Sequence, residues 1–419
     1  MLVKDNVGVR KLARAGLMGI MSWFMAGCQE SSPPPVPKPI FGQTLPWSGE
    51  PFDLMAEDIN GDSHLDLTVM DHGGNNAQLF YQDAQRQWSP GPSFTGVGFH
   101  PGNLFRWPGD PARYILSAEG DNAVRVLTAD AAAGFKIESQ LNEVKPRYGN
   151  RFRWPGWGDS LVLSPFDMDS LFLLKDYDPA QGKAAERIHV PLAEQPPSVL
   201  WPGPITVTDI DADGSDDLLY ATQVTRQVFV VQAPRSVPIT PKKKQKPKQT
   251  PIKPRLLATD PLWGGPSQVV DGELNGDGWV DLLVPDETLP GKINVLVNVG
   301  QGSFKAAPSI DSPHDQGITE LKTARDKDGL RYILSAGYGF LALYQVPIGW
   351  VPEQPLTPRA IRWKKADHAT ALALQDLDGD GWLDLVLGRS NGEKRLWVLY
   401  GPLWDRFAAM TAQQYDLDN

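Results

Sequence analysis

Cysteine is almost missing from this chain of 419 residues, which contains a single one, Cys28. A lone cysteine excludes an intrachain disulfide, and it excludes a metal site or a heme attachment built from several cysteines. A structural metal in this protein would therefore need other ligands.

A surplus of positive charge is also lacking. The chain has 40 Lys and Arg against 50 Asp and Glu, which gives a formal net charge of −10. Because binding to nucleic acid depends on neutralising phosphates, this balance argues against a nucleic-acid partner.

Helical periodicity is scarce, and only the residues around Gln413 near the C-terminus offer a weak helical candidate. Glycine and proline are abundant instead, with 40 and 38 copies. Such a composition favours many short strands joined by tight turns over a helical protein.

A long apolar run is absent as well. The run at residues 15–25 follows a basic segment and is too short for a transmembrane helix, which needs about 20 residues. We therefore expect residues 1–27 to be a cleaved signal peptide.

This segment ends in Met25-Ala26-Gly27-Cys28, which resembles a bacterial lipobox. The resemblance implies acylation of Cys28, cleavage before it and anchoring in a lipid bilayer, and Gln29 implies sorting to the outer membrane of the cell envelope. A plain secretory signal with a chance cysteine is the alternative. Residues 28–44 are rich in proline and are expected to form a stiff tether.

One short acidic loop recurs along the remaining chain. Its clearest copy starts at Asp376, holds four carboxylates within nine residues and includes two glycines. Carboxylates crowded in this way repel each other unless a cation lies among them, and Ca²⁺ prefers such oxygen ligands. Similar loops start at Asp58, Asp209 and Glu273, and each leads into an apolar, strand-like run.

Three further units complete the repeat. In two of them Arg-Trp-Pro-Gly, at residues 106–109 and 153–156, occupies the place of the acidic loop, and the third has a turn at residues 325–329 without the full acidic set. Seven units of roughly 45 to 65 residues match the blades of a β-propeller. We predict an all-β, seven-bladed propeller over residues 45–402, with residues 403–419 as a C-terminal tail or closing strand.

The four acidic loops resemble the FG-GAP/VCBS repeat family, bacterial relatives of the integrin α-subunit propeller. This resemblance covers about residues 45–402 and implies structural Ca²⁺ in the hairpin between the first two strands of a blade, in up to four blades. It does not fix a function.

Loop geometry and the resemblance together assign the metal ligands. Side chains at loop positions one, three, five and nine bind the ion, together with the carbonyl at position seven. The four sets are Asp58, Asn60, Asp62, His64 and Asp66; Asp209, Asp211, Asp213, Ser215 and Asp217; Glu273, Asn275, Asp277, Trp279 and Asp281; and Asp376, Asp378, Asp380, Trp382 and Asp384. Two departures weaken the pattern: Ser63 replaces a glycine, and Glu273 replaces an aspartate. The alternative is a set of metal-free turns whose Asp and Asn side chains accept backbone N–H groups.

A second set of residues precedes the first strand of each unit and forms a candidate ligand-binding rim. Its members are Trp47, His100, Tyr148, Trp201, Trp263, His314 and His368. In a propeller these segments lie opposite the first hairpins, around the channel mouth, where flat rings suit a sugar. The alternative is that they wedge neighbouring blades apart in the core.

Residues 234–255 form an insertion between the fourth and fifth units, rich in lysine and proline and free of acidic residues. We expect an extended loop that is either solvated or in contact with an anionic partner.

No catalytic motif appears in the sequence. The favoured interpretation is an envelope-anchored, Ca²⁺-stabilised binding or scaffolding lipoprotein that recognises a glycan or a protein partner. The alternative is a polysaccharide lyase or hydrolase with its site at the channel mouth, for which His100, Arg147, His314 and His368 are the candidates.

Overall fold

The structure of the protein is a computed structural model, and it describes residues 42–109, 111–130, 133–142, 144–165, 170–192, 202–234, 251–260, 262–364, 367–391 and 395–418, with the side chain of His314 excepted. The signal peptide, Cys28 and most of the tether lie outside the described residues, as do Trp201 and residues 235–250 of the basic insertion.

The described residues form seven four-stranded antiparallel sheets, which we call blades 1 to 7. Blade 1 comprises β2 (Pro51–Glu57), β3 (Asp66–Asp71), β4 (Asn76–Gln82) and β5 (Trp88–Phe94). Blade 2 comprises β6 (Pro101–Trp107), β7 (Arg113–Ala118), β8 (Ala123–Asp130) and β9 (Gly134–Asn142). Blade 3 comprises β10 (Pro146–Phe152), β11 (Ser160–Pro165), β12 (Ser170–Lys175) and β13 (Glu186–Pro191).

The remaining blades follow the same order. Blade 4 comprises β14 (Thr206–Thr208), β15 (Asp217–Thr222), β16 (Gln227–Val231) and β17 (Arg255–Thr259). Blade 5 comprises β18 (Val270–Gly272), β19 (Asp281–Pro285), β20 (Lys292–Asn298) and β21 (Phe304–Asp311). Blade 6 comprises β22 (Ile318–Arg325), β23 (Arg331–Gly337), β24 (Phe340–Val346) and β25 (Arg359–Arg362). Blade 7 comprises β26 (Ala369–Gln375), β27 (Asp384–Arg389), β28 (Leu396–Leu399) and β1 (Gln43–Thr44). Two short 3₁₀ turns, η1 (Thr95–Val97) and η2 (Pro313–Asp315), precede blades 2 and 6.

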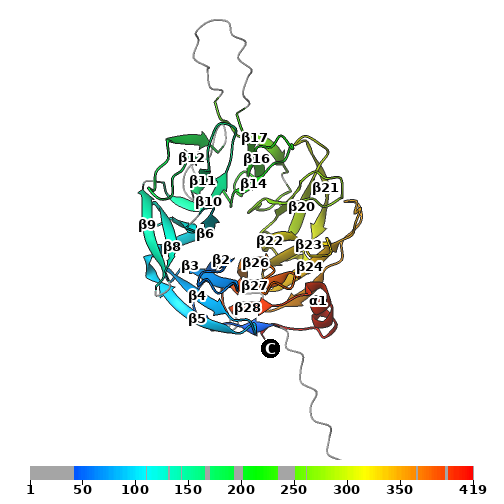
Figure 1. Cartoon of the computed structure of the whole chain (residues 1–419). Coiled ribbons are helices and arrows are strands. Elements are labelled where there is room, and N and C mark those ends of the chain that lie inside the picture. Colours follow the sequence, from blue (N-terminus) through cyan, green and yellow to red (C-terminus); the bar gives the residue numbers. More distant parts are fainter. Residues whose placement is uncertain are drawn as a thin grey trace, which may run out of the picture. The chain divides into compact units, whose positions relative to one another are not determined.

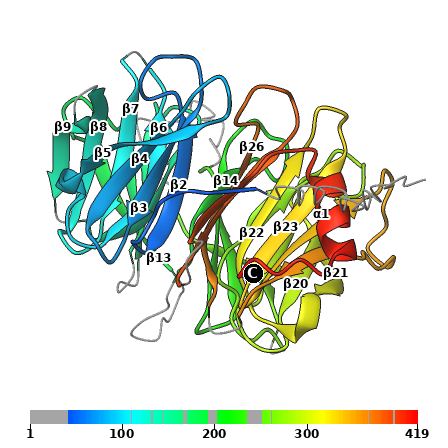
Figure 2. The same ribbon diagram turned by 90° about the horizontal axis from the view of Figure 1, so that it is seen from below.

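The first strand of each blade lies innermost, and these seven strands contact one another in succession around the centre of the ring (Figure 1). Figure 2 shows the blades from the side, with their strands running between the two faces of the ring. The predicted seven-bladed propeller is thereby confirmed.

Seven apolar clusters hold the ring together, one between each pair of neighbouring blades. The second strands β3, β11, β15 and β27 are buried along their whole length because both faces of the sheet are covered by neighbouring blades. This explains why these strands appear in the sequence as continuous apolar runs, whereas the outer strands such as β5 and β13 are mostly polar or exposed.

Polar side chains also link the innermost strands. Asn103 Nδ2 donates to the carbonyl of Gly149 in the next blade, at 2.9 Å, and Thr319 Oγ1 donates to the carbonyl of Ala369, at 2.7 Å. These bonds satisfy backbone groups that face the channel and would otherwise lack a strand partner.

Ring closure uses the beginning of the chain. Gln43 and Thr44, which we placed at the end of the tether, form β1 and pair with β28 as the outermost strand of blade 7. The residues after blade 7 form a helix, α1 (Leu403–Ala412), instead of a closing strand, and this helix packs on the cluster between blades 6 and 7.

The basic insertion also sits elsewhere than predicted. Because Arg255 belongs to β17 and pairs with Val230 of β16, the insertion lies within blade 4, between its third and fourth strands, and not between blades 4 and 5.

Candidate functional site

The four acidic loops lie on one face of the ring, which we call the loop face. Each connects the first and second strands of a blade, at residues 58–66, 209–217, 273–281 and 376–384. The segments that enter the first strands, together with the turns between second and third strands, lie at the other end of the blades. We call that side the channel face.

Within the loops, side-chain oxygens hold the backbone in a tight curl. The carboxylate of Asp376 accepts the N–H groups of Gly379 and Gly381, at 2.8 and 2.9 Å, and Asp384 accepts those of Leu377 and Gly401, both at 2.7 Å. The residues at position seven contribute N–H donors in the same way, each bonding the carboxylate at position five: His64 to Asp62, Ser215 to Asp213, Trp279 to Asp277 and Trp382 to Asp380.

Two of the loops bring three carboxylates together. Oxygens of Asp209, Asp211 and Asp217 in blade 4 lie within 4.8 Å of one another, and so do those of Asp376, Asp378 and Asp384 in blade 7. Burial, with a smaller contribution from neighbouring carboxylates, raises the pKa of both Asp217 and Asp384 to about 7. These sets of three carboxylates, each with its oxygens close together, fit a hard divalent cation.

An unpartnered atom strengthens the fit in blade 4. Oδ1 of Asp211 is buried and accepts no hydrogen bond from the described residues, while Oδ2 accepts one from Gln232 at 3.1 Å. A buried carboxylate oxygen without a donor is costly unless a cation contacts it.

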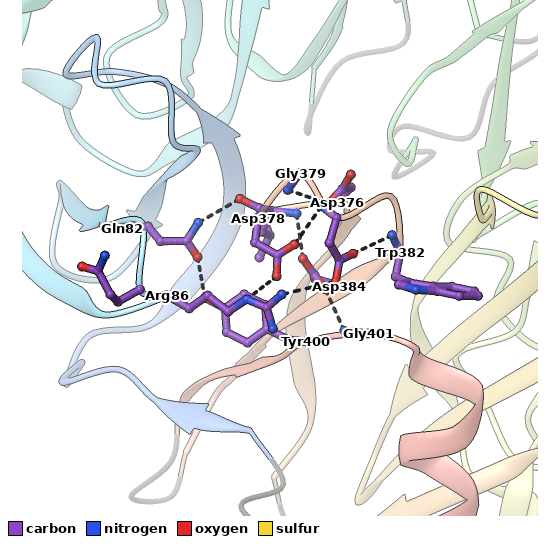
Figure 3. A network of polar contacts seen from close by, with 12 residues as sticks. Gln82, Arg86, Asp376, Asp378, Gly379, Trp382, Asp384, Tyr400 and Gly401 are labelled. Carbon is purple, nitrogen blue, oxygen red and sulfur yellow. Dashed lines mark hydrogen bonds and ion pairs between the residues drawn. The ribbon is translucent and has the colours of Figure 1, made fainter.

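The blade 7 loop is joined to blade 1 by a polar network (Figure 3). Arg86 Nε lies 2.7 Å from Asp378 Oδ2, and Gln82 Nε2 donates to the carbonyl of Leu377 at 2.8 Å. The loop therefore already has one cation at its edge, which offsets part of its negative charge.

The loop of blade 5 differs, because arginines from blade 6 occupy its first carboxylate. Glu273 Oε2 lies 2.7 Å from Arg325 and also pairs with Arg331. With its charge already neutralised and with Asn275 at position three, this loop fits a divalent cation less well than those of blades 4 and 7.

The loop of blade 1 likewise lacks a cluster of three acidic groups within its described residues. Its Asp66 accepts backbone N–H groups from Ile59, Asn60 and Gln82 at 3.0 to 3.3 Å. Hydrogen bonds from backbone N–H groups therefore satisfy the carboxylate of Asp66, and the described loop residues include no group of three acidic side chains that could hold a metal ion.

The candidate rim residues fall into two groups. Trp263 is buried in the cluster between blades 4 and 5, and Trp47 packs edge-on against Phe80 between blades 7 and 1. Tyr148 and His368, in contrast, line the central channel. His314 lies in η2, and nothing is described of its side chain.

A stack of rings runs from the channel face into the channel. His100 stacks on Phe99, with centroids 4.1 Å apart, and contacts His72 at 4.7 Å; His72 stacks on Phe52 at 4.5 Å, and Phe52 lies 6.1 Å from Tyr148. These rings mostly cover one another, so few of their flat faces are free for a ligand.

The central channel contains a cavity of about 740 Å³ to which all seven blades contribute. His368 lines it, whereas His100 and Arg147, two other candidates for catalysis, do not. The guanidinium of Arg147 instead lies over the rings of Tyr148 and Phe52, 5.4 and 5.8 Å from their centroids.

Several channel residues were not predicted, chiefly Phe52, Asp53, His72 and Glu320. The sequence does hold a signal for two of them. Asp53 and Glu320 are charged residues in the first strand of a unit, near the end where the strand enters the blade, and their side chains line the channel. No described helix is long and apolar enough to cross a membrane.

Comparison with known proteins shows the fold. No family model matches the chain, and no curated protein matches it in sequence. Among solved structures it resembles BBS1N crystallised in complex with ARL6DN and soaked with lead, with a TM-score of 0.54 and 12% identity over 86% of this chain and 97% of that one. The mercury-soaked crystal of the same complex gives 0.53 and 12% identity, over 87% and 95% of the two chains.

A weaker likeness links the chain to an Agrocybe aegerita lectin that recognises non-reducing terminal N-acetylglucosamine. Its TM-score is 0.48 with 14% identity, over 74% of this chain and 81% of the lectin. At 12% identity, the likeness to BBS1N supports the propeller fold and shows nothing about the ligand.

Proposed function

We propose that this protein is a binding or scaffolding module that docks a protein partner on its channel face. The observation that carries this proposal is an exposed apolar patch beside the channel mouth, formed by Val224, Leu262 and Leu289. These side chains are 48%, 88% and 69% exposed.

Hydrogen bonds link the turns that carry these three side chains. Gln223 Nε2, next to Val224, donates to Glu287 Oε2 at 2.9 Å. The N–H groups of Gly264 and Gly265 bond the carboxylate of Asp286, at 2.6 and 2.8 Å. Glu287 in turn lines the channel, so the patch and the cavity form one surface. Grouped apolar side chains rimmed by polar ones are typical of protein-binding surfaces.

A protein partner fits this face better than a glycan. Sugar recognition would favour several exposed flat rings, but Trp47 and Trp263 pack between blades, which leaves Phe99 and Tyr338 as the exposed rings among the described residues of this face, at 51% and 37%. Branched aliphatic side chains such as Val224, Leu262 and Leu289 suit the apolar residues of a protein surface.

The acidic loops have a separate, structural role in this proposal. Ca²⁺ would be held by Asp209, Asp211 and Asp217 in blade 4 and by Asp376, Asp378 and Asp384 in blade 7, and its charge would offset the repulsion between these carboxylates. The carboxylate convergence in these two loops supports their kinship with FG-GAP/VCBS repeats.

The proposal also places the protein on the bacterial outer membrane through acylated Cys28. Its support is the sequence at residues 1–28, and the test is metabolic labelling with a radioactive fatty acid. The label should appear on the native chain and be absent from Cys28→Ala. Equal labelling of both would contradict the anchor.

Affinity capture from the native envelope tests the docking face. The Leu262→Asp/Leu289→Asp double variant should lose the protein that co-purifies with the native chain, because two charges are placed in the apolar patch. Ile348→Asp, at an 83% exposed residue on the loop face, is the matched control and should retain it. The assignment of the channel face as the docking surface would be contradicted if only the control variant lost the co-purifying protein, or if neither variant lost it.

A further inference from the structure

The central cavity carries an excess of acidic groups. Its charged lining consists of five carboxylates and one amine: Glu50, Asp53, Asp271, Glu287, Glu320 and Lys322. The histidines His72 and His368 also line it, and burial lowers the pKa of His368.

The protein does little to neutralise this charge from within. Glu320 accepts no hydrogen bond from the described residues, and Asp53 accepts only backbone N–H groups, from Leu104 at 2.8 Å and from Leu54. Lys322 forms no ion pair with the described carboxylates, although its charge lies near Asp53 and Glu320.

Burial makes these charges costly. Desolvation, with smaller contributions from the carboxylates of Asp53 and Glu287, raises the pKa of Glu320 to about 8 against the opposing effect of Lys322. Desolvation also raises the pKa of Asp53 to about 6. A cation that enters the channel would therefore interact favourably with groups that lack a partner.

The lining favours an organic cation over a metal ion. Among the described residues, three acidic groups converge closely enough to hold a metal only in the two loops, and not in the channel. The rings of Phe52, Tyr148 and Tyr338 line the cavity instead. Aromatic faces attract guanidinium and ammonium groups, and the guanidinium of Arg147 already lies over Phe52 and Tyr148, so Tyr338 is the ring that an added cation would meet.

We propose that the channel accepts a lysine or arginine side chain of the docked protein, whose charged end lies between Asp53 and Glu320. This inference rests on the proposed function and specifies its chemistry. Apolar residues of the partner would cover Val224, Leu262 and Leu289 while a neighbouring basic residue enters the channel from the same face.

A charge-matched pair of small probes tests the inference on the full chain. N-acetyl-L-arginine amide should bind, as followed by ligand-observed NMR, and N-acetyl-L-citrulline amide, which has nearly the same shape and no charge, should bind at least tenfold more weakly. Glu320→Gln and Asp53→Asn should each weaken arginine-amide binding at least fivefold. Glu353→Gln, an exposed residue in the loop between β24 and β25, should leave it unchanged.

Equal binding of the two probes, or unchanged affinity in both channel variants, would overturn the inference. A melting curve checks that each variant is folded. The proposed function and this inference can fail separately. If Leu262→Asp/Leu289→Asp abolishes partner capture while Glu320→Gln and Asp53→Asn do not, the partner docks on the channel face but inserts no basic side chain into the channel. If the double variant retains the partner, the docking face itself is wrong.

Discussion

At the scale of single residues, the acidic loops show where backbone conformation limits the sequence. Position six adopts positive φ in all four loops, with Gly214, Gly278 and Gly381 at 84°, 88° and 86° and Ser63 at 71°. Ala212, at position four of its loop, also has a positive φ, of 56°. Residues with a Cβ are strained in this region, which glycine occupies freely.

Replacing either strained residue with glycine should therefore stabilise the protein. We expect Ser63→Gly and Ala212→Gly each to raise the free energy of unfolding by about 0.5–1 kcal/mol. Urea melts measure the change. Ala306→Gly in strand β21 is the control and should destabilise, because it adds flexibility without relieving strain; a loss of stability in the loop variants would contradict the assignment.

Glu320 gives the second prediction at this scale. Its folded pKa of about 8 lies above the ordinary value of 4.5 for a glutamate, so the folded state binds the proton more tightly than the unfolded state. Stability from this group is then present below pH 4.5 and is lost as the pH rises to about 8. The groups that face it are Asp53, Glu287 and Lys322.

Glu320→Gln should consequently be more stable than the native protein at pH 8.5, by about 4–5 kcal/mol, with the difference vanishing near pH 4.5. Urea melts across this pH range test it. A stability difference that does not change with pH would show that Glu320 has an ordinary pKa in the folded protein.

At the scale of loops and strands, the sequence predicts most of the architecture. The apolar run predicted after each acidic loop forms the second strand of its blade, β3, β15, β19 or β27, because repeats with strong apolar patterns specify strands locally. The outer strands are harder to predict from the sequence, since their exposed residues show little regular alternation of apolar and polar side chains. Gln43–Thr44 could not be recognised as a strand because its partner, β28, lies more than 350 residues further on.

The same limit applies to the sites. The sequence identifies four acidic loops, but it cannot show that Arg325 and Arg331 of blade 6 reach Glu273, or that Trp47 and Trp263 face the core. Both depend on contacts between blades, which arise only when the ring closes.

Removing calcium should destabilise the ring through two loops. We expect EDTA to lower the melting temperature of the native protein by about 5 °C or more, because a bound ion stabilises only the folded state. The Asp211→Asn/Asp378→Asn double variant should lose this sensitivity, whereas Asn275→Ala in the blade 5 loop should retain it. Scanning calorimetry measures both, and a native melt unchanged by EDTA would contradict the calcium assignment.

The loop of blade 5 should depend on the arginines of blade 6 for its stability, and not on calcium. Arg331 and Glu273 have side chains only 12% and 13% exposed, so Arg331→Gln leaves a nearly buried carboxylate with one of its cations lost. We expect a loss of about 2–3 kcal/mol whether or not calcium is present.

A double-mutant cycle separates this pair from other effects. Arg331→Gln/Glu273→Gln should regain part of the lost stability, because no unpaired charge remains. If calcium restores the single variant fully, the blade 5 loop holds a metal and the arginines do not replace it.

At the scale of the whole molecule, the two faces of the ring have different roles. The loop face carries carboxylates that pin the hairpins, and the channel face carries the apolar patch and the acidic cavity. Ring closure by β1 and the packing of α1 on blades 6 and 7 hold the faces in register. Recognition on one face can then change without disturbing the stabilising loops on the other.

Site-specific photo-crosslinking in the native envelope tests this division most directly. A photoreactive phenylalanine analogue would replace Tyr338 at the channel mouth or, in a second variant, Val299 on the loop face, which are 37% and 64% exposed. We predict a discrete protein adduct from position 338 and none from position 299. Adducts from position 299 alone would contradict the assignment of the channel face as the docking surface.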